Sequence, residues 1–173
     1  KRSSTDGTVI RYNAEAVDKM PLTKVQGMIA HTVMHPAFLH HTRRGNRDKN
    51  KWQKACDHSI NTILKNAGFD LPEGTYADPQ YNGHTAEHIY TMLPDEPEGG
   101  GGGGGGGGSG QNQNQNGQDP GGDGGVDDSP QSQNGGGSQS QQNHEEAEWK
   151  VAVAQAAHVA KQSGKCPAGL DRM

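Results

Sequence analysis

The chain has 173 residues, of which 27 are glycine and only 28% are hydrophobic, and its formal net charge is −4. This hydrophobic content supports one small folded domain, no apolar run approaches the roughly 20 residues that span a bilayer, and the mild acidity gives no general argument for nucleic-acid binding. The two cysteines, Cys56 and Cys166, are too far apart in sequence for a C-x-x-C metal half-site or a disulfide framework, so we expect a reducing, cytoplasmic setting.

Residues 1–98 carry the pattern of a small, mainly α-helical (α+β) domain that begins with a strand. Thr8–Tyr12 is β-branched and aromatic and follows an Asp-Gly turn signal, which predicts a short N-terminal β-strand or hairpin. Apolar side chains then recur at helical spacing from about residue 22 to about residue 40. Pro36 lies inside this predicted helix and has no backbone N–H to donate, so we expect a kink at that position.

Two further helices complete this predicted domain. Helical spacing resumes from about residue 48 and continues to residue 67, where Gly68 supplies a stop signal. Thr85 has the properties of an N-cap for a short third helix, which Pro94 ends.

A low-complexity segment separates this domain from the last part of the chain. Residues 99–143 consist almost entirely of Gly, Gln, Asn, Ser, Asp and Pro, and their only apolar aliphatic side chain is that of Val126. Such a composition cannot offset its ordering entropy, so we expect a disordered linker. Residues 144–173 predict an alanine-rich C-terminal helix, and because it has few large apolar residues we expect it to pack on the first domain.

A pair of histidines, His31 and His35, gives the clearest chemical signal. Four residues apart on a helix, they project from one face and lie close enough for both imidazoles to bind one metal ion. The spacing is that of the H-E-x-x-H motif of zinc hydrolases, whose glutamate acts as general base on the zinc-bound water. Thr32 occupies the glutamate position here. The sequence therefore predicts a zinc site without its catalytic base, and the alternative is two polar side chains on a half-buried helix face.

A catalytic zinc site needs a third protein ligand. Asp57 is the preferred candidate, because two antiparallel helices joined by a short connection can bring this carboxylate over the histidine pair. Asn61, one turn further on, shares its face and could orient a ligand. The alternative interpretation of Asp57 is an ordinary acidic residue on a helix surface.

His41 is the competing third ligand. The positions of His31, His35 and His41 have the spacing found in zinc proteases whose chain turns sharply after the second histidine. Those sites have a glycine at the position that Phe38 occupies here, so we expect the helix to continue and to carry His41 to another face.

A basic stretch follows the histidines. Residues 43–54 contain six basic side chains and one acid, Asp48, and could bind phosphate or an acidic peptide. A solvated loop and helix start is the simpler interpretation. Nucleic-acid binding is the weaker alternative, since no series of aromatic residues for base stacking accompanies the charges.

Several segments of the chain resemble a known protein family. These segments are Ala30–Ala37, His40–Gly45, Ala55–Asp57, Ala67–Phe69, Trp149–Ala156 and Gly164–Leu170. Together they resemble the zincin-like metallopeptidase domain that lies N-terminal to von Willebrand factor A-like domains in bacterial and phage proteins. The resemblance covers nearly all of the chain outside the Gly/Gln/Asn segment. It implies a mostly helical zincin-like fold with zinc at His31 and His35, and a von Willebrand factor A-like domain in the full-length protein. The chain departs from the family at Thr32, where the family has glutamate.

These features together predict a zinc metallopeptidase-type domain that binds Zn²⁺ through His31, His35 and Asp57. Because Thr32 cannot accept a proton at neutral pH, we expect peptide-bond hydrolysis to be absent or strongly impaired. A non-catalytic protein-binding module, with or without structural zinc, is the alternative. We expect a peptide or protein as substrate or partner, and no membrane.

Overall fold

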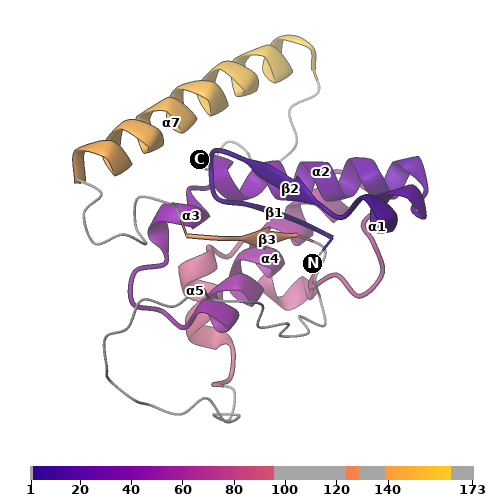
Figure 1. Cartoon of the computed structure of the whole chain (residues 1–173), viewed down its shortest axis with the longest axis horizontal. Coiled ribbons are helices and arrows are strands. Elements are labelled where there is room, and N and C mark those ends of the chain that lie inside the picture. Colours follow the sequence, from indigo (N-terminus) through magenta and orange to yellow (C-terminus); the bar gives the residue numbers. More distant parts are fainter. Residues whose placement is uncertain (1, 96–123, 129–138, 165–173) are drawn as a thin grey trace.

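The computed structural model describes residues 2–95, 124–128 and 139–164 of the chain. As the sequence predicts, these residues form a mainly α-helical domain with a small β-sheet (Figure 1). Two long helices, α2 (Leu22–Ala37) and α4 (Lys49–Asn66), pack against each other, and the sheet packs on α2. Among the helices of the described ranges, none combines the length and the apolar character that crossing a bilayer requires.

The sheet has three short strands in the order β2-β1-β3. Strand β1 (Ser3–Thr5) pairs antiparallel with β2 (Ile10–Tyr12) and parallel with β3 (Gly125–Val126). The predicted N-terminal strand is therefore confirmed as β2, and it is the second strand of a hairpin whose first strand is an all-polar run without an apolar alternation. β3 lies inside the range 99–143 that the composition predicts to be a disordered linker; residues 96–123 and 129–138 of the chain lie outside the described residues.

The carboxylate of Asp6 organises the turn between β1 and β2. Its Oδ1 accepts hydrogen bonds from the backbone N–H groups of Thr8 (3.1 Å) and Val9 (3.0 Å) and from the Thr8 hydroxyl (2.8 Å). Its Oδ2 lies 2.9 Å from the guanidinium of Arg11. Burial alone would raise the pKa of Asp6, but these hydrogen bonds outweigh it and lower the pKa to about 2.

The helix predicted for residues 22 to 40 ends earlier than expected. After the short helix α1 (Ala14–Asp18), α2 runs from Leu22 to Ala37, with Pro36 in its last turn. The chain then reverses at Leu39, whose φ of 59° lies in the left-handed region, and a short helix α3 (His40–Arg43) begins. The predicted continuation of the helix past residue 38 is therefore wrong, because Leu39, one residue after the position at which those zinc proteases have a glycine, adopts a left-handed conformation and turns the chain.

The second and third predicted helices are confirmed. Helix α4 begins after Asp48, whose side chain accepts a hydrogen bond from the N–H of Lys51 at 2.8 Å, and helix α5 (Ala86–Met92) begins after its N-cap Thr85. A short 3₁₀ helix, η1 (Pro79–Tyr81), lies between them. One face of α4 packs against η1 and α5 and forms the apolar core, whose buried members are Trp52, Ala55, Cys56, Tyr81, Ala86 and Ile89.

Helix α7 (Gln139–Gln162) lies along one side of the domain (Figure 1). It begins before residue 144, where the composition places the start of the C-terminal segment. The indole Nε1 of Trp149 donates a hydrogen bond of 3.0 Å to the carbonyl of Gly7 in the hairpin turn. Glu145 is buried near the same turn, so α7 contacts the domain through its N-terminal half.

Candidate metal centre

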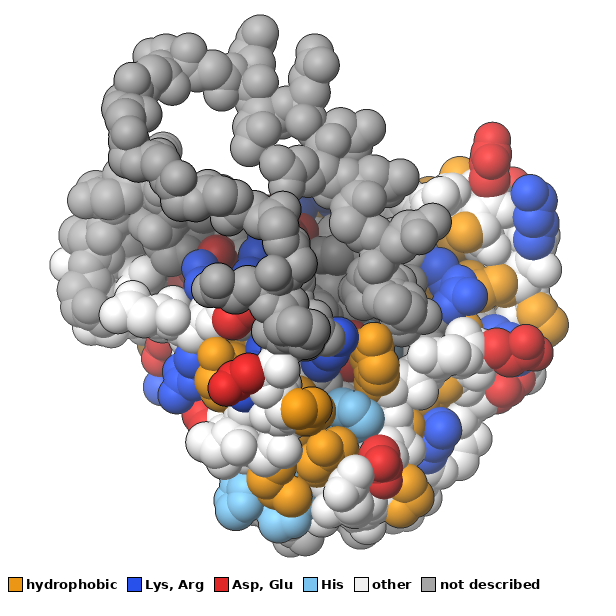
Figure 2. Space-filling view, turned by 90° about the horizontal axis from the view of Figure 1, so that it is seen from below, with side chains coloured by type: hydrophobic (Ala, Val, Ile, Leu, Met, Phe, Trp, Pro, Cys, Tyr) orange, Lys and Arg blue, Asp and Glu red, His pale blue; other side chains and the backbone are white. Residues whose placement is uncertain are grey.

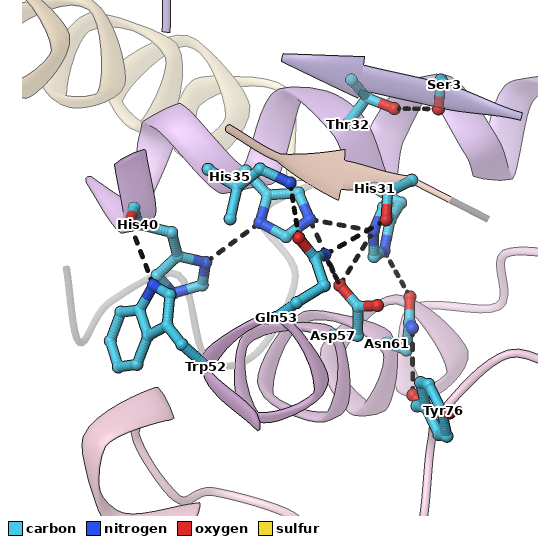
Figure 3. A network of polar contacts seen from close by, with 12 residues as sticks. Ser3, His31, Thr32, His35, His40, Trp52, Gln53, Asp57, Asn61 and Tyr76 are labelled. Carbon is cyan, nitrogen blue, oxygen red and sulfur yellow. Dashed lines mark hydrogen bonds and ion pairs between the residues drawn. The ribbon is translucent and has the colours of Figure 1, made fainter. Parts of the chain in front are cut away.

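Three side chains from two helices meet in the interior. His31 and His35 project from one face of α2 toward α4, and Asp57 projects from α4 toward them (Figure 3). The Nε2 atoms of the two imidazoles lie 3.0 Å apart, and Asp57 Oδ1 lies 3.5 Å from His31 Nε2 and 3.4 Å from His35 Nε2. Among the described residues, these three form the cluster of His, Cys, Asp or Glu side chains that could hold a metal ion.

The spacing of the three atoms fits a tetrahedral ion. In a tetrahedral zinc site with metal–ligand bonds of about 2.0–2.1 Å, neighbouring ligand atoms lie about 3.3 Å apart. The observed separations of 3.0, 3.4 and 3.5 Å bracket that value. The exposed fractions of His31, His35 and Asp57 are 1%, 0% and 1%. These separations are compatible with one ion bound to all three atoms.

Asn61 orients His31. The amide Oδ1 of Asn61 lies 2.6 Å from Nδ1 of His31, and its Nδ2 donates to the carbonyl oxygen of Tyr76 at 3.0 Å. Because the amide oxygen can only accept, Nδ1 of His31 carries a hydrogen, and Nε2 is the nitrogen that faces the other ligand atoms. The structure thus places Asn61 in the orienting position that its spacing from Asp57 predicts.

His40 supports the second imidazole, and our sequence reasoning missed it. Its Nδ1 lies 3.3 Å from Nδ1 of His35, and its backbone carbonyl accepts a hydrogen bond of 3.2 Å from the indole of Trp52. Burial, followed by the neighbouring positive groups, lowers the pKa of His40 well below its ordinary value. A neutral His40 can accept the Nδ1 hydrogen of His35, and Nε2 is then the nitrogen of His35 that could bind a metal ion. The only feature of the sequence that indicated this role was the position of His40 close after His31 and His35.

Gln53 supports the carboxylate, and it was also missed. Its Nε2 donates to Oδ1 of Asp57 at 2.7 Å, from a position one helical turn earlier on α4. The i, i+4 spacing of a glutamine and an aspartate was the signal that could have found it.

The electrostatics of the cluster favour an ionised carboxylate. Burial alone would raise the pKa of Asp57, but hydrogen bonds and charge from His31 and His35 outweigh it and lower the pKa. Burial would likewise lower the pKa of His31, yet the hydrogen bond and the charge of Asp57 raise it. A buried carboxylate with two imidazoles is a donor set suited to a divalent cation. Cys56 is not part of this set, because it lies in the apolar core, where burial raises the pKa of its thiol well above its ordinary value.

Thr32 lies on the same helix but its hydroxyl is engaged elsewhere. Its Oγ1 donates to the carbonyl of Met28 at 2.8 Å and lies 2.7 Å from Oγ of Ser3 on β1. Figure 3 shows this hydroxyl directed toward the strand, away from the imidazoles. Thr32 is fully buried. The position at which the motif has its glutamate therefore joins α2 to the sheet here.

His41, the competing third ligand, lies away from the centre. Its Nε2 is 3.1 Å from Oε1 of Glu145 on α7, on the side of the hairpin turn. Burial lowers the pKa of His41, while the charge of Glu145 opposes that shift. His41 does reach another face, as expected, but the reversal at Leu39 takes it there rather than a continuing helix.

The basic stretch 43–54 is largely neutralised by acidic side chains. Arg47 packs its guanidinium over the ring of Trp52 at 5.1 Å instead of facing an acid. On the face seen in Figure 2, basic and acidic side chains of the described residues are interspersed. This arrangement gives no support to nucleic-acid binding. The ion pairs are Arg43–Glu87, Arg44–Asp128, Lys49–Asp127 and Lys51–Asp95.

Comparison with known proteins gives a family and one distant relative. A family described as "Putative metallopeptidase domain" matches residues 1–173. A protein of Thermotoga maritima, described as an uncharacterized protein, is 34% identical over 99 residues, which are 54% of this chain and 24% of that protein. The match thus spans about a quarter of the relative's length. No solved structure matches the chain.

Proposed function

The chain belongs to this metallopeptidase-domain family, and from that membership we propose that it is a zincin-type domain binding one Zn²⁺ through His31, His35 and Asp57. The observation that carries the proposal is the approach of three buried ligand atoms to within 3.0–3.5 Å of one another. Two nitrogen ligands and one carboxylate, with a fourth position left for water or substrate, form the ligand set of a catalytic zinc site. Peptide-bond hydrolysis is the chemistry of this lineage.

The residues around the cluster have positioning roles in this proposal. A bound zinc ion would supply a water of lowered pKa and would polarise a substrate carbonyl. Asn61 holds His31 with Nε2 toward the centre, His40 does the same for His35, and Gln53 holds the Asp57 carboxylate. These contacts keep the ligand atoms in place before any ion binds.

Thr32 makes the chain a poor hydrolase. A general base contributes about 10²–10⁴-fold to a rate, and a threonine hydroxyl cannot accept a proton at neutral pH. Its hydrogen bonds to Met28 and Ser3 also direct it away from the centre. We therefore propose that hydrolysis is strongly impaired in this chain.

Metal content tests the first part of the proposal. The purified full chain should hold about one zinc per molecule by mass spectrometry, and His31→Ala or Asp57→Ala should lose it. His88→Ala is the matched control, because His88 on α5 and His84, just before that helix, are another pair of histidines four residues apart, with ring centroids 4.6 Å apart. A parent chain that binds no zinc from a micromolar solution contradicts the proposal.

Thr32→Glu tests the second part. In zinc-loaded protein this variant should hydrolyse an unstructured protein about 10²–10⁴-fold faster than the parent. Thr32→Gln is the control, because a glutamine side chain has the size of a glutamate but cannot act as a general base. If Thr32→Glu binds zinc, folds and is as inactive as Thr32→Gln, the proposal that the missing base is what impairs hydrolysis is contradicted. The second candidate function, a protein-binding module with structural zinc, would then be favoured by the complete burial of the cluster.

A further inference from the structure

A short strand from the glycine-rich part of the chain crosses the metal centre. Gly124 lies so close to His31 that a β-carbon on it would be 2.4 Å from the imidazole Cδ2. In Figure 3, β3 passes beside both His31 and His35. Because the three ligand residues are at most 1% exposed, a substrate carbonyl that approaches past Gly124 must take the place of this strand.

The backbone of the strand is held as an extended peptide. Gln53 contacts it twice: its Nε2 donates to the carbonyl of Gly124 at 3.2 Å, and its Oε1 accepts from the N–H of Val126 at 2.8 Å. Strand β1 completes the pairing, with the carbonyl of Thr5 accepting from the N–H of Asp127 at 2.8 Å. These contacts go to main-chain groups, so a different peptide could make them as well.

The side chains of the strand occupy distinct positions. Val126 is 6% exposed, so the position two residues after Gly124 is enclosed. Asp128 accepts two hydrogen bonds of 2.6 Å from Nε and Nη2 of Arg44, in a bidentate arrangement. The neighbouring Asp127 lies 3.5 Å from Nζ of Lys49. The groove therefore accepts a small residue at His31, an aliphatic residue two positions on and acidic residues at the following two positions.

We propose that this groove, between β1 and α4 over the metal centre, is a docking site for an extended acidic peptide, and that residues 124–128 occupy it as an internal competitor. The peptide class is the one that the bound segment represents: glycine, any residue, an aliphatic residue and two acids. The proposal rests on the proposed function for the role of the centre beneath the peptide, but peptide binding itself requires no hydrolysis.

The experiment uses a fluorescent peptide, Gly-Gly-Val-Asp-Asp with blocked ends, and the full chain. In the parent, the tethered segment competes at an effective concentration on the order of millimolar, so the added peptide should bind weakly. Two variants should release the segment: Gly124→Ala, whose methyl collides with His31, and Val126→Asp, which puts a charge in an enclosed position. Each should bind the peptide at least tenfold more tightly than the parent by fluorescence anisotropy.

Charge recognition is tested in the released background. Adding Arg44→Gln to Gly124→Ala should weaken binding of the peptide about tenfold, and the control peptide Gly-Gly-Val-Asn-Asn should bind equally weakly to both proteins. Equal binding of the two peptides would overturn the assignment of Arg44 and with it the acidic class. Folded variants that bind no better than the parent would overturn the docking site. Loss of cooperative unfolding in both release variants would overturn it as well, because the segment would then be an integral strand.

The same samples separate this proposal from the zinc proposal. Zinc content is measured before each titration, and each titration is repeated after chelator treatment. A chain without zinc whose release variants bind the peptide supports the docking site while refuting the zinc hydrolase. A zinc-containing chain whose release variants gain no affinity refutes the docking site alone.

Discussion

The side-chain amide of Asn61 determines which nitrogen of His31 is available to a metal ion. Its Nδ2 donates to the carbonyl of Tyr76, so its orientation is fixed by a group that can only accept. Its Oδ1 then faces Nδ1 of His31, and Nε2 is left for the ion. An imidazole without this partner could present either tautomer and could rotate away from the centre.

Asn61→Ala should therefore lower zinc affinity about 10–100-fold without removing a ligand. The change is measured by competition with a chromophoric chelator. Asn66→Ala is the matched control, because Asn66 is an exposed amide near the end of the same helix whose Nδ2 donates to Asn82. A folded Asn61→Ala variant with the zinc affinity of Asn66→Ala would show that the amide has no positioning role.

The ionisation of Asp6 should make the free energy of unfolding depend on pH in the acidic range. Its pKa is about 2 in the folded chain, against an ordinary value of 3.8, so the folded state binds the proton less readily than the unfolded state. The stabilisation is complete above pH 4 and is lost as the pH falls from about 4 to about 2, and it amounts to about 2 kcal/mol. Urea titrations between pH 2 and pH 6 should show this slope in the parent and a smaller slope in Asp6→Asn. Asp18→Asn, an exposed change, should leave the slope as it is in the parent, and an equal slope in Asp6→Asn would contradict the assignment.

At the scale of elements, the reversal between α2 and α3 depends on a strained residue. Leu39 has a φ of 59°, which costs a non-glycine residue about 1 kcal/mol or more and costs a β-branched residue most. Leu39→Ile keeps the side-chain volume and should lower the free energy of unfolding by about 1–2 kcal/mol in urea titrations. Leu39→Asn should tolerate the same φ and lose less stability. Leu22→Ile, at an exposed position of α2, is the control for the leucine-to-isoleucine change, and equal stabilities of the Leu39→Ile and Leu22→Ile variants would exclude strain at this turn.

Elements with strong local signals could be predicted from the sequence. The Asp48 cap of α4 and the Thr85 cap of α5 are local, and both helices begin where these residues indicate. β1 could not be predicted, because Ser3–Thr5 has no apolar alternation and is held by pairing and by contacts such as that of Ser3 with Thr32. β3 is held by Gln53, which lies 71 to 73 residues away in the chain, so its environment is invisible to any local pattern.

The same distinction applies to the candidate site. The spacing of His31 and His35 and the antiparallel arrangement of two helices were enough to select the three residues that the structure brings together. The role of His40 depends on the reversal at Leu39, and our expectation of a continuous helix concealed it. The second role of Gln53 depends on β3, which the composition of its segment concealed.

At the scale of the whole molecule, α4 separates two interiors of different chemistry. One face of α4 packs on η1 and α5 through the apolar core, and the opposite face carries Gln53, Asp57 and Asn61 against α2. The contact between α2 and α4 therefore includes a cluster of polar side chains, which contribute little hydrophobic stabilisation. An ion bound to His31, His35 and Asp57 would link α2 to α4 through the polar face of α4, which the apolar core does not cover.

Zinc should consequently stabilise the whole fold, and its removal should destabilise it. An ion that binds only the folded chain adds about 2.7 kcal/mol at a free concentration of 100 times its dissociation constant. For a domain of this size each kcal/mol raises Tm by about 4 °C, so the gain should be about 10 °C in a calorimetric scan. The parent and His88→Ala should show this rise with zinc and lose it with chelator, whereas Asp57→Asn should melt at the same temperature in both solutions. Since Asp57→Asn keeps the side-chain size and removes the charge, an equal zinc-dependent rise in this variant would mean that the ion binds elsewhere and that α2 and α4 are not joined through the predicted cluster.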